Sequence, residues 1–255
     1  NNNPEKSYAF FSMSSTIVGA IIIYVSGSIL NNFGYQSFFI SLFIFYLLLI
    51  PLILFIKEKP VNELIKPGRE DLNVKTVLLL IIGILSFELA SGGMWAFDER
   101  LGVEFIGISI SSVALVLSIS TLTGLLAPPI VLYIGNRYGR SLPIYIGVTS
   151  ILMCFIWILK YPSYFSFFAG NIIWYFFFTM TVIYVLAASA IISPTGRLAS
   201  WLNAAILIGM SVAPSFFGYI LDRGTFIDLL PLLFAFILIT LICITFIRKT
   251  LDQTE

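Results

Sequence analysis

The sequence contains no histidine, only two cysteines and few charged residues. Without histidine, the chain lacks the side chain that most often serves as general base, metal ligand and proton carrier near neutral pH. Cys154 and Cys243 lie inside apolar runs, which indicates two small hydrophobic side chains rather than a disulfide or a metal pair. No phosphate-binding glycine loop and no intramembrane catalytic constellation is present. We therefore expect neither an enzyme nor an ATPase, and no cofactor.

Hydrophobic residues dominate what is present. They make up 59% of the 255 residues, charged residues make up 11%, and the mean hydropathy is +1.01. A soluble domain of this length needs a polar surface, so the composition indicates a multi-pass membrane protein whose main partner is the lipid bilayer. The net charge of +1 gives no sign of a nucleic-acid partner.

Apolar runs long enough to cross a hydrocarbon core of about 30 Å need roughly 20 residues. The sequence predicts eight such spans, at 9–30, 38–56, 76–97, 109–134, 142–159, 164–192, 199–221 and 229–247. The longest and most charged connection between them covers residues 57–75.

The distribution of basic residues supports this topology. With a cytoplasmic N-terminus, three basic residues fall outside (Arg100, Lys160 and Arg223). Eleven fall inside: Lys6, Lys57, Lys59, Lys66, Arg69, Lys75, Arg137, Arg140, Arg197, Arg248 and Lys249. This positive-inside bias predicts a cell-membrane protein with both ends of the chain in the cytoplasm.

An internal repeat suggests a larger design. The segments that begin at Pro4 and Pro194 share polar starts, and Gly19 and Gly34 recur 190 residues later as Gly209 and Gly224. Transporters are often built from such repeats. The first span then corresponds to the seventh, which predicts twelve spans with four before residue 1, on the same chain or on a partner.

Three features together resemble the major facilitator superfamily of transporters. They are the charged linker at 57–75, the turn "GNRYGR" from Gly135 to Arg140, and the span "GMSVAPSFFGYILDRG". The turn is similar to the family's loop motif G-x-L-A-D-R-x-G-R-R through Arg137, Gly139 and Arg140. Asn136 replaces the motif's Asp, Leu132 its first Gly and Ser141 its last basic residue.

The resemblance implies an all-α membrane protein whose eight helices form the C-terminal two-thirds of a twelve-helix fold. Residues 1–56 would close the N-terminal half, 57–75 would be the cytoplasmic linker, and 76–255 would form the C-terminal half with a short cytoplasmic tail. Spans three and six would line the central cavity, and spans four and seven would form the moving interface. The interface and hinge candidates are Pro128, Pro129, Gly209, Pro214 and Gly218, since small residues and Pro suit close packing and bending.

Glu88 is an acid in the middle of the third predicted span. A carboxylate in the bilayer centre costs about 2.5–3.5 kcal/mol on insertion scales, so such residues usually carry function. At helical spacing it shares one face with Ser91, Gly92 and Trp95. We expect Glu88 to exchange a proton or to pair with a cationic solute. The alternative is a protonated Glu that makes a structural hydrogen bond to a neighbouring helix.

A second face in the sixth span places Asn171, Trp174, Tyr175 and Phe178 together. An amide and several aromatic rings suit an aromatic or amphipathic solute, although such a stripe also fits plain packing. The acidic and basic run from Asp98 to Arg100 is interpreted as a solvated helix end, with an outer gate as the alternative.

These features predict a secondary active transporter of a small organic solute that works by alternating access and is coupled to protons. Uptake is favoured, because the first span lacks the Gly-Pro pair found in many antiporters of the family. Efflux by proton antiport and a truncated, non-transporting fragment are the alternatives.

Overall fold

The computed structural model describes residues 4–54 and 72–252, and within these ranges the chain is helical and contains no strand. The elements are α1 (Pro4–Leu54), α2 (Val74–Arg100), η2 (Leu101–Phe105), α3 (Ile110–Thr123), η3 (Gly124–Leu126), α4 (Ala127–Ile134), α5 (Ser141–Lys160), α6 (Tyr164–Ile192), α7 (Arg197–Leu221), η4 (Phe226–Leu229) and α8 (Leu230–Leu251).

Six helices among the described residues are long and apolar enough to cross a membrane. They are Val74–Phe105, Ser112–Ile134, Ser141–Lys160, Tyr164–Ile192, Arg197–Leu221 and Phe226–Leu251. Large apolar side chains such as Leu238 and Phe246 lie exposed on α8, as a surface in contact with lipid requires. The chain is therefore a multi-pass membrane protein, and these six helices agree with the last six predicted spans.

The first two predicted spans, 9–30 and 38–56, fall on α1. Gly34 breaks α1 with φ 75° and ψ 179°, so the element consists of two helical arms joined between the predicted spans. The apolar stretches identified there, Tyr8–Val18 and Phe39–Pro51, are shorter than a full span. These two spans stay predictions. Most of the predicted linker, residues 57–71, lies outside the described residues, and α2 begins within its last two positions at Val74.

Local sequence signals explain where the helices of the bundle begin and end. The Asn73 side chain accepts a hydrogen bond from the Lys75 backbone N–H (3.0 Å) and caps α2. Ser163 and Ser166 form a capping box at the start of α6. Gly135 and Gly139, with φ 55° and 73°, make the turn that separates α4 from α5.

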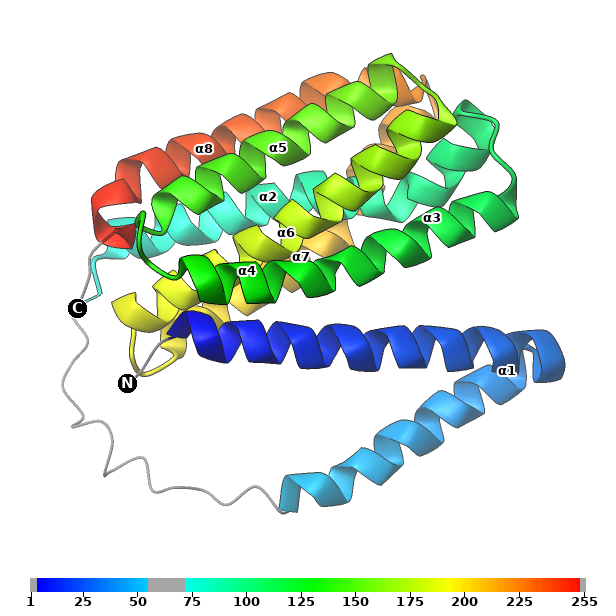
Figure 1. The fold of residues 1–255 in the computed structure, drawn as a ribbon, viewed down its shortest axis with the longest axis horizontal. Coiled ribbons are helices and arrows are strands. Elements are labelled where there is room, and N and C mark those ends of the chain that lie inside the picture. The colour runs from blue at the N-terminus through cyan, green and yellow to red at the C-terminus, as the bar shows by residue number, and fades with distance from the viewer. Residues whose placement is uncertain (1–3, 55–71, 253–255) are drawn as a thin grey trace. The chain divides into compact units, whose positions relative to one another are not determined.

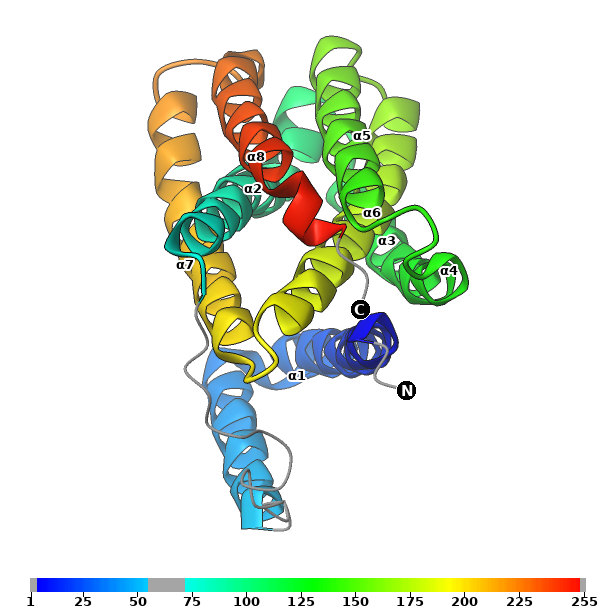
Figure 2. The same ribbon diagram turned by 90° about the vertical axis from the view of Figure 1, so that its left-hand side faces the viewer.

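The bundle is built around α2 and α6. Helix α2 packs on α7 and α8, and α6 packs on α5, α3 and α4. Figure 1 shows α5 beside α8, and Figure 2 shows α7 running next to α2. Among the six candidate spans, those of α2 and α6 have the largest buried shares, 67% and 56%. Polar side chains on these two helices are consequently the ones best shielded from the surroundings.

Candidate functional site

The predicted face of α2 and part of the predicted face of α6 come together around one cavity of about 120 Å³. Its wall consists of four residues of α2, three of α6 and one of α7: Glu88, Ser91, Gly92, Trp95, Trp174, Tyr175, Phe178 and Met210. Seven of these eight were expected at the site from helical spacing. Met210 was missed because only the packing of α7 against α2 brings it there.

Small residues permit the close approach of α7 behind Glu88. A Cβ on Gly209 would lie 2.6 Å from the Cβ of Glu88 and 3.2 Å from the carbonyl oxygen of Leu85. A Cβ on Gly92 would lie 3.1 Å from the Cα of Met210. The two backbones therefore touch through a small-residue contact of the kind that packs membrane helices.

Several polar atoms of this site lack hydrogen-bond partners among the described residues. Glu88 is fully buried, and neither of its carboxylate oxygens has a hydrogen-bond partner among the described residues. The Ser91 hydroxyl and the Trp174 indole Nε1 are also buried and unpaired within that part of the chain. Buried polar groups are nearly always hydrogen-bonded, and leaving one unmet costs about 1–3 kcal/mol. A site with acceptor and donor groups left open is suited to a proton, water or a bound solute.

Aromatic rings form the rest of the wall. The Trp95 ring centroid lies 6.0 Å from that of Trp174 and 5.6 Å from that of Tyr175. Phe178 stacks on Phe87 at 5.6 Å with an interplanar angle of 11°. Such spacings are those of favourable aromatic pairs, so the rings of the wall stabilise one another.

Asn171 does not line this cavity, contrary to the prediction from its helical face. Its Nδ2 donates to the Phe167 carbonyl (3.0 Å) and to Oδ1 of Asp98 (3.4 Å). Asn171 lies one turn before Trp174 on α6, so its side chain reaches the Arg100 end of α2 rather than the cavity.

Asp98 corrects a second expectation. It is 1% exposed and forms part of the buried core, whereas Glu99 and Arg100 are exposed as predicted. The solvated-end interpretation failed because the apolar helix does not stop at Arg100, where α2 ends, but continues as the π-helical segment η2 to Phe105. The signal was available, since Asp98 falls seven residues after Ser91 on the same helical face.

The turn with the loop motif is organised by an acid that sequence reasoning did not identify. Asp252, just after α8, accepts hydrogen bonds from the Ser141 backbone N–H (2.8 Å) and hydroxyl (2.6 Å). A Cβ on Gly139 would lie 2.5 Å from the Asp252 carboxylate, so only Gly fits. Partial burial works in the opposite direction, but hydrogen bonds from Ser141 and the Arg140 backbone, with the charge of Arg248, lower the pKa of the Asp252 carboxyl.

The other motif residues also have defined places. Arg140 is buried, and the exposed Arg137 guanidinium lies 5.2 Å from the Tyr133 ring centroid. The Gly135 carbonyl accepts a hydrogen bond from the Tyr184 hydroxyl (3.0 Å), which ties the turn to α6. The buried Oδ1 of Asn136, the residue at the position of the motif's Asp, has no partner in the described chain.

The hinge candidates occupy two different settings. Pro128 and Pro129 lie in the first turn of α4, directly after the 3₁₀ turn η3 that interrupts the span. Pro214 lies inside α7, which continues through it. A Cβ on Gly218 would make an ordinary 3.5 Å contact with the Phe97 ring. The interruption of the α3–α4 span agrees with the predicted bending there, and a hinge motion stays a prediction.

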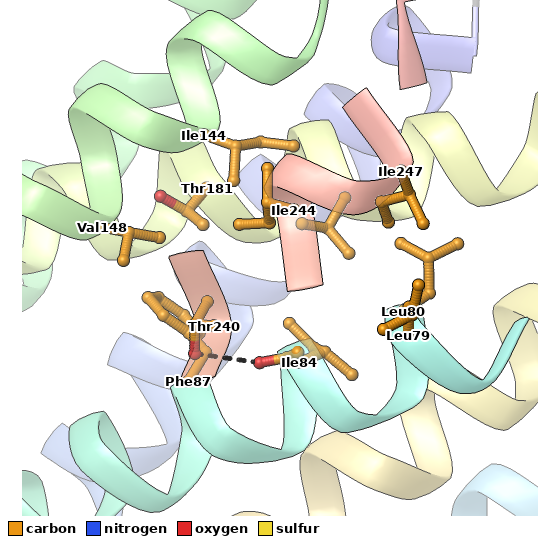
Figure 3. A pocket seen from close by; sticks show the side chains of 12 residues that line it. Leu79, Leu80, Ile84, Phe87, Ile144, Val148, Thr181, Thr240, Ile244 and Ile247 are labelled. Carbon is orange, nitrogen blue, oxygen red and sulfur yellow. Dashed lines mark hydrogen bonds between the residues drawn. The ribbon is translucent and has the colours of Figure 1, made fainter. Parts of the chain in front are cut away.

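A second cavity, of about 20 Å³, lies between α2, α5, α6 and α8 and is lined mainly by apolar side chains (Figure 3). Its Thr240 hydroxyl donates to the Gly83 carbonyl (3.1 Å). A space this small holds at most about one water molecule. Of these two cavities, the one beside Glu88 is therefore the candidate solute site. Among residues 4–54 and 72–252, no group of three or more His, Cys, Asp or Glu side chains is placed to hold a metal ion.

Comparison with protein families and with curated proteins found no match to this chain.

Proposed function

We propose that the protein is a secondary active transporter of the major facilitator superfamily that takes up a small organic solute with protons by alternating access. The observation that carries the proposal is the Glu88 carboxylate, which lies in the wall of an aromatic cavity inside a membrane bundle and has no hydrogen-bond partner in residues 4–54 and 72–252. Intramembrane acids of this kind commonly mark proton or substrate pathways.

The chemistry of the wall favours a solute with an aromatic or otherwise apolar body. Trp95, Tyr175 and Phe178 offer ring faces for stacking, and the Trp174 indole N–H offers one donor to orient a polar group. Glu88 binds a proton or a cationic group, and the change in its charge state alters which helix arrangement is favoured.

The cavity is smaller than a site for an organic solute. Pockets for organic ligands commonly measure about 300–1,000 Å³, whereas this one measures about 120 Å³. Transport would require the site to open, and the close contact of α7 with α2 at Gly209 supports a moving surface beside Glu88 as part of this proposal.

The test is uptake of a panel of aromatic and amphipathic solutes into liposomes that contain the full-length protein, with and without a pH gradient. We expect gradient-driven accumulation of at least one solute, reduced about tenfold or more by Glu88→Gln and unchanged by the exposed matched control Glu99→Gln. Gradient-driven movement in the opposite direction would assign proton antiport instead. Uptake that ignores the gradient and survives Glu88→Gln would refute proton coupling.

A further inference from the structure

A second acid lies on the face of α2 that carries Glu88. Asp98 is ten residues further along the helix, about 15 Å away at the usual rise. It is 1% exposed, and its Oδ2 has no hydrogen-bond partner among the described residues. The side chain thus has one polar contact, the 3.4 Å bond from Asn171.

Asn171, the hydrogen-bond partner of Asp98, also has one buried oxygen without a donor in the described residues. Asn171 is fully buried; its Nδ2 donates to Asp98 and to the Phe167 carbonyl, while its Oδ1 has no donor in the described part of the chain. The pair therefore holds two acceptor oxygens without donors, one on each side chain. A hydrogen on Oδ2 of Asp98 would supply a donor for Oδ1 of Asn171 and would turn the single bond of the pair into a two-bond acid–amide ring.

No described cation is placed to neutralise Asp98 instead. Helices α3 and α6 contain no Asp, Glu, Lys or Arg, and the basic residues of α8 lie at its opposite end. The charged side chains at the nearby helix ends are exposed or bonded to other residues. Glu99, Lys160 and Asp222 are exposed. Arg100 pairs with Glu104, Arg223 donates a hydrogen bond to the Tyr219 carbonyl, and Asp228 accepts one from the Thr225 hydroxyl. Apart from Arg197 at the start of α7, the other titratable side chains on α5 to α8 and the connecting turns are tyrosines and cysteines, which carry no positive charge in either protonation state: Tyr145, Cys154, Tyr161, Tyr164, Tyr175, Tyr184, Tyr219 and Cys243.

We propose that Asp98 and Asn171 form a second proton-binding site, in which Asp98 carries a proton while it is buried as in this structure and shares it with Asn171. When the Arg100 end of α2 opens to water, the O–H bond of Asp98 breaks, the proton passes to water, and the carboxylate keeps the Asn171 N–H bond. The role of this step in coupling rests on the proposed transport function, whereas the protonation of Asp98 does not.

Infrared difference spectroscopy of the full-length protein tests the protonation directly. Protonated carboxyl groups give a C=O stretch that carboxylates lack. In a Glu88→Gln background at neutral pH, we expect one such band, which Asp98→Asn removes and Glu99→Gln leaves in place. Asn171→Leu is expected to move the band to higher frequency, because the carboxyl loses the donor to its carbonyl oxygen.

The two variants of the pair differ in their expected stability. Asn at position 98 reproduces the protonated state with an amide–amide pair, so Asp98→Asn should keep the melting temperature of the wild type. If Asp98→Asn fails to fold, the frequency shift in Asn171→Leu still decides the assignment. Absence of a carboxyl band that responds to either substitution would refute the second site.

Transport measurements test the coupling role separately. Reversal potentials give the number of protons moved per solute molecule. In Asp98→Asn this number should be lower by one than in the wild type. An unchanged ratio, with the infrared band present, would refute the coupling role alone. Solute uptake that is independent of pH in the wild type would refute the proposed function, and the infrared result would still decide whether Asp98 binds a proton.

Discussion

The acidic side chains at the interface of α2 with α6 receive far fewer hydrogen bonds than the acidic side chain at the turn between α4 and α5. At the turn, Asp252 receives two hydrogen bonds from Ser141 and lies near the Arg248 side chain (3.6 Å). At the interface, Glu88 has no hydrogen-bond partner within the described part of the chain, and Asp98 has one long bond, from Asn171. An acid that holds a turn together is supplied with donors, whereas an acid left short of donors in the membrane is suited to exchange a proton.

Among substitutions that test this comparison, Asn171→Leu is expected to change protein stability most. The substitution removes the one side-chain donor to Asp98 and leaves a buried carboxyl without a partner, which should lower the free energy of unfolding by about 3 kcal/mol. The matched control is Asn203→Leu, because Asn203 is exposed and its side chain donates to the Ala199 carbonyl of its own helix (2.9 Å). Thermal melting in detergent measures both, and equal melting temperatures would show that the pair contributes nothing.

Gly209→Ala should destabilise the protein by about 2 kcal/mol, because overpacking a well-filled contact costs about 1–3 kcal/mol. The new Cβ would meet the Cβ of Glu88 at 2.6 Å. Gly218→Ala on the same helix meets the Phe97 ring at an ordinary 3.5 Å and should change stability by less than about 0.5 kcal/mol. If the two variants melt alike, the close approach of α7 behind Glu88 is wrong.

Trp174→Phe keeps a ring in the cavity wall and removes the unpaired indole N–H. If that donor orients the solute, binding should weaken by about 1 kcal/mol, close to a fivefold rise in Kd. Trp157→Phe on α5, outside the cavity, serves as the control. Calorimetric titration with a solute found in the uptake screen measures both, and an unchanged Kd in Trp174→Phe would exclude a hydrogen bond to the solute.

The smallest effect is expected from Asp252→Asn, which should lower the free energy of unfolding by about 1 kcal/mol or less at neutral pH. The effect is small because Asn keeps one oxygen that accepts a hydrogen bond from Ser141. The folded-state pKa of Asp252 lies below the ordinary value of about 3.8. The stabilisation is therefore complete above that value and is lost as the pH falls through the folded-state pKa. Melting curves of both proteins should converge on acidification, and a constant difference at all pH values would contradict the charge-based explanation.

Much of the candidate site was predictable from helical spacing alone. The faces of Glu88, Ser91, Gly92 and Trp95 on α2, and of Trp174, Tyr175 and Phe178 on α6, were each expected, and they share one cavity. The spacing works because apolar runs of this length form helices in a membrane and residues three and four apart must lie on one side.

The sequence by itself determined the multi-pass helical class, six apolar helices and the buried acid, because composition, run length and helical period are local properties of the chain. Only the tertiary structure decided that Asp98 is buried, that Asn171 leaves the cavity to meet it, and that Asp252 supplies the acid at the turn with the loop motif. Each of these depends on contacts between residues 73 or 111 positions apart in the chain. Such contacts are fixed by how the helices pack, which neither charge clustering nor local periodicity specifies.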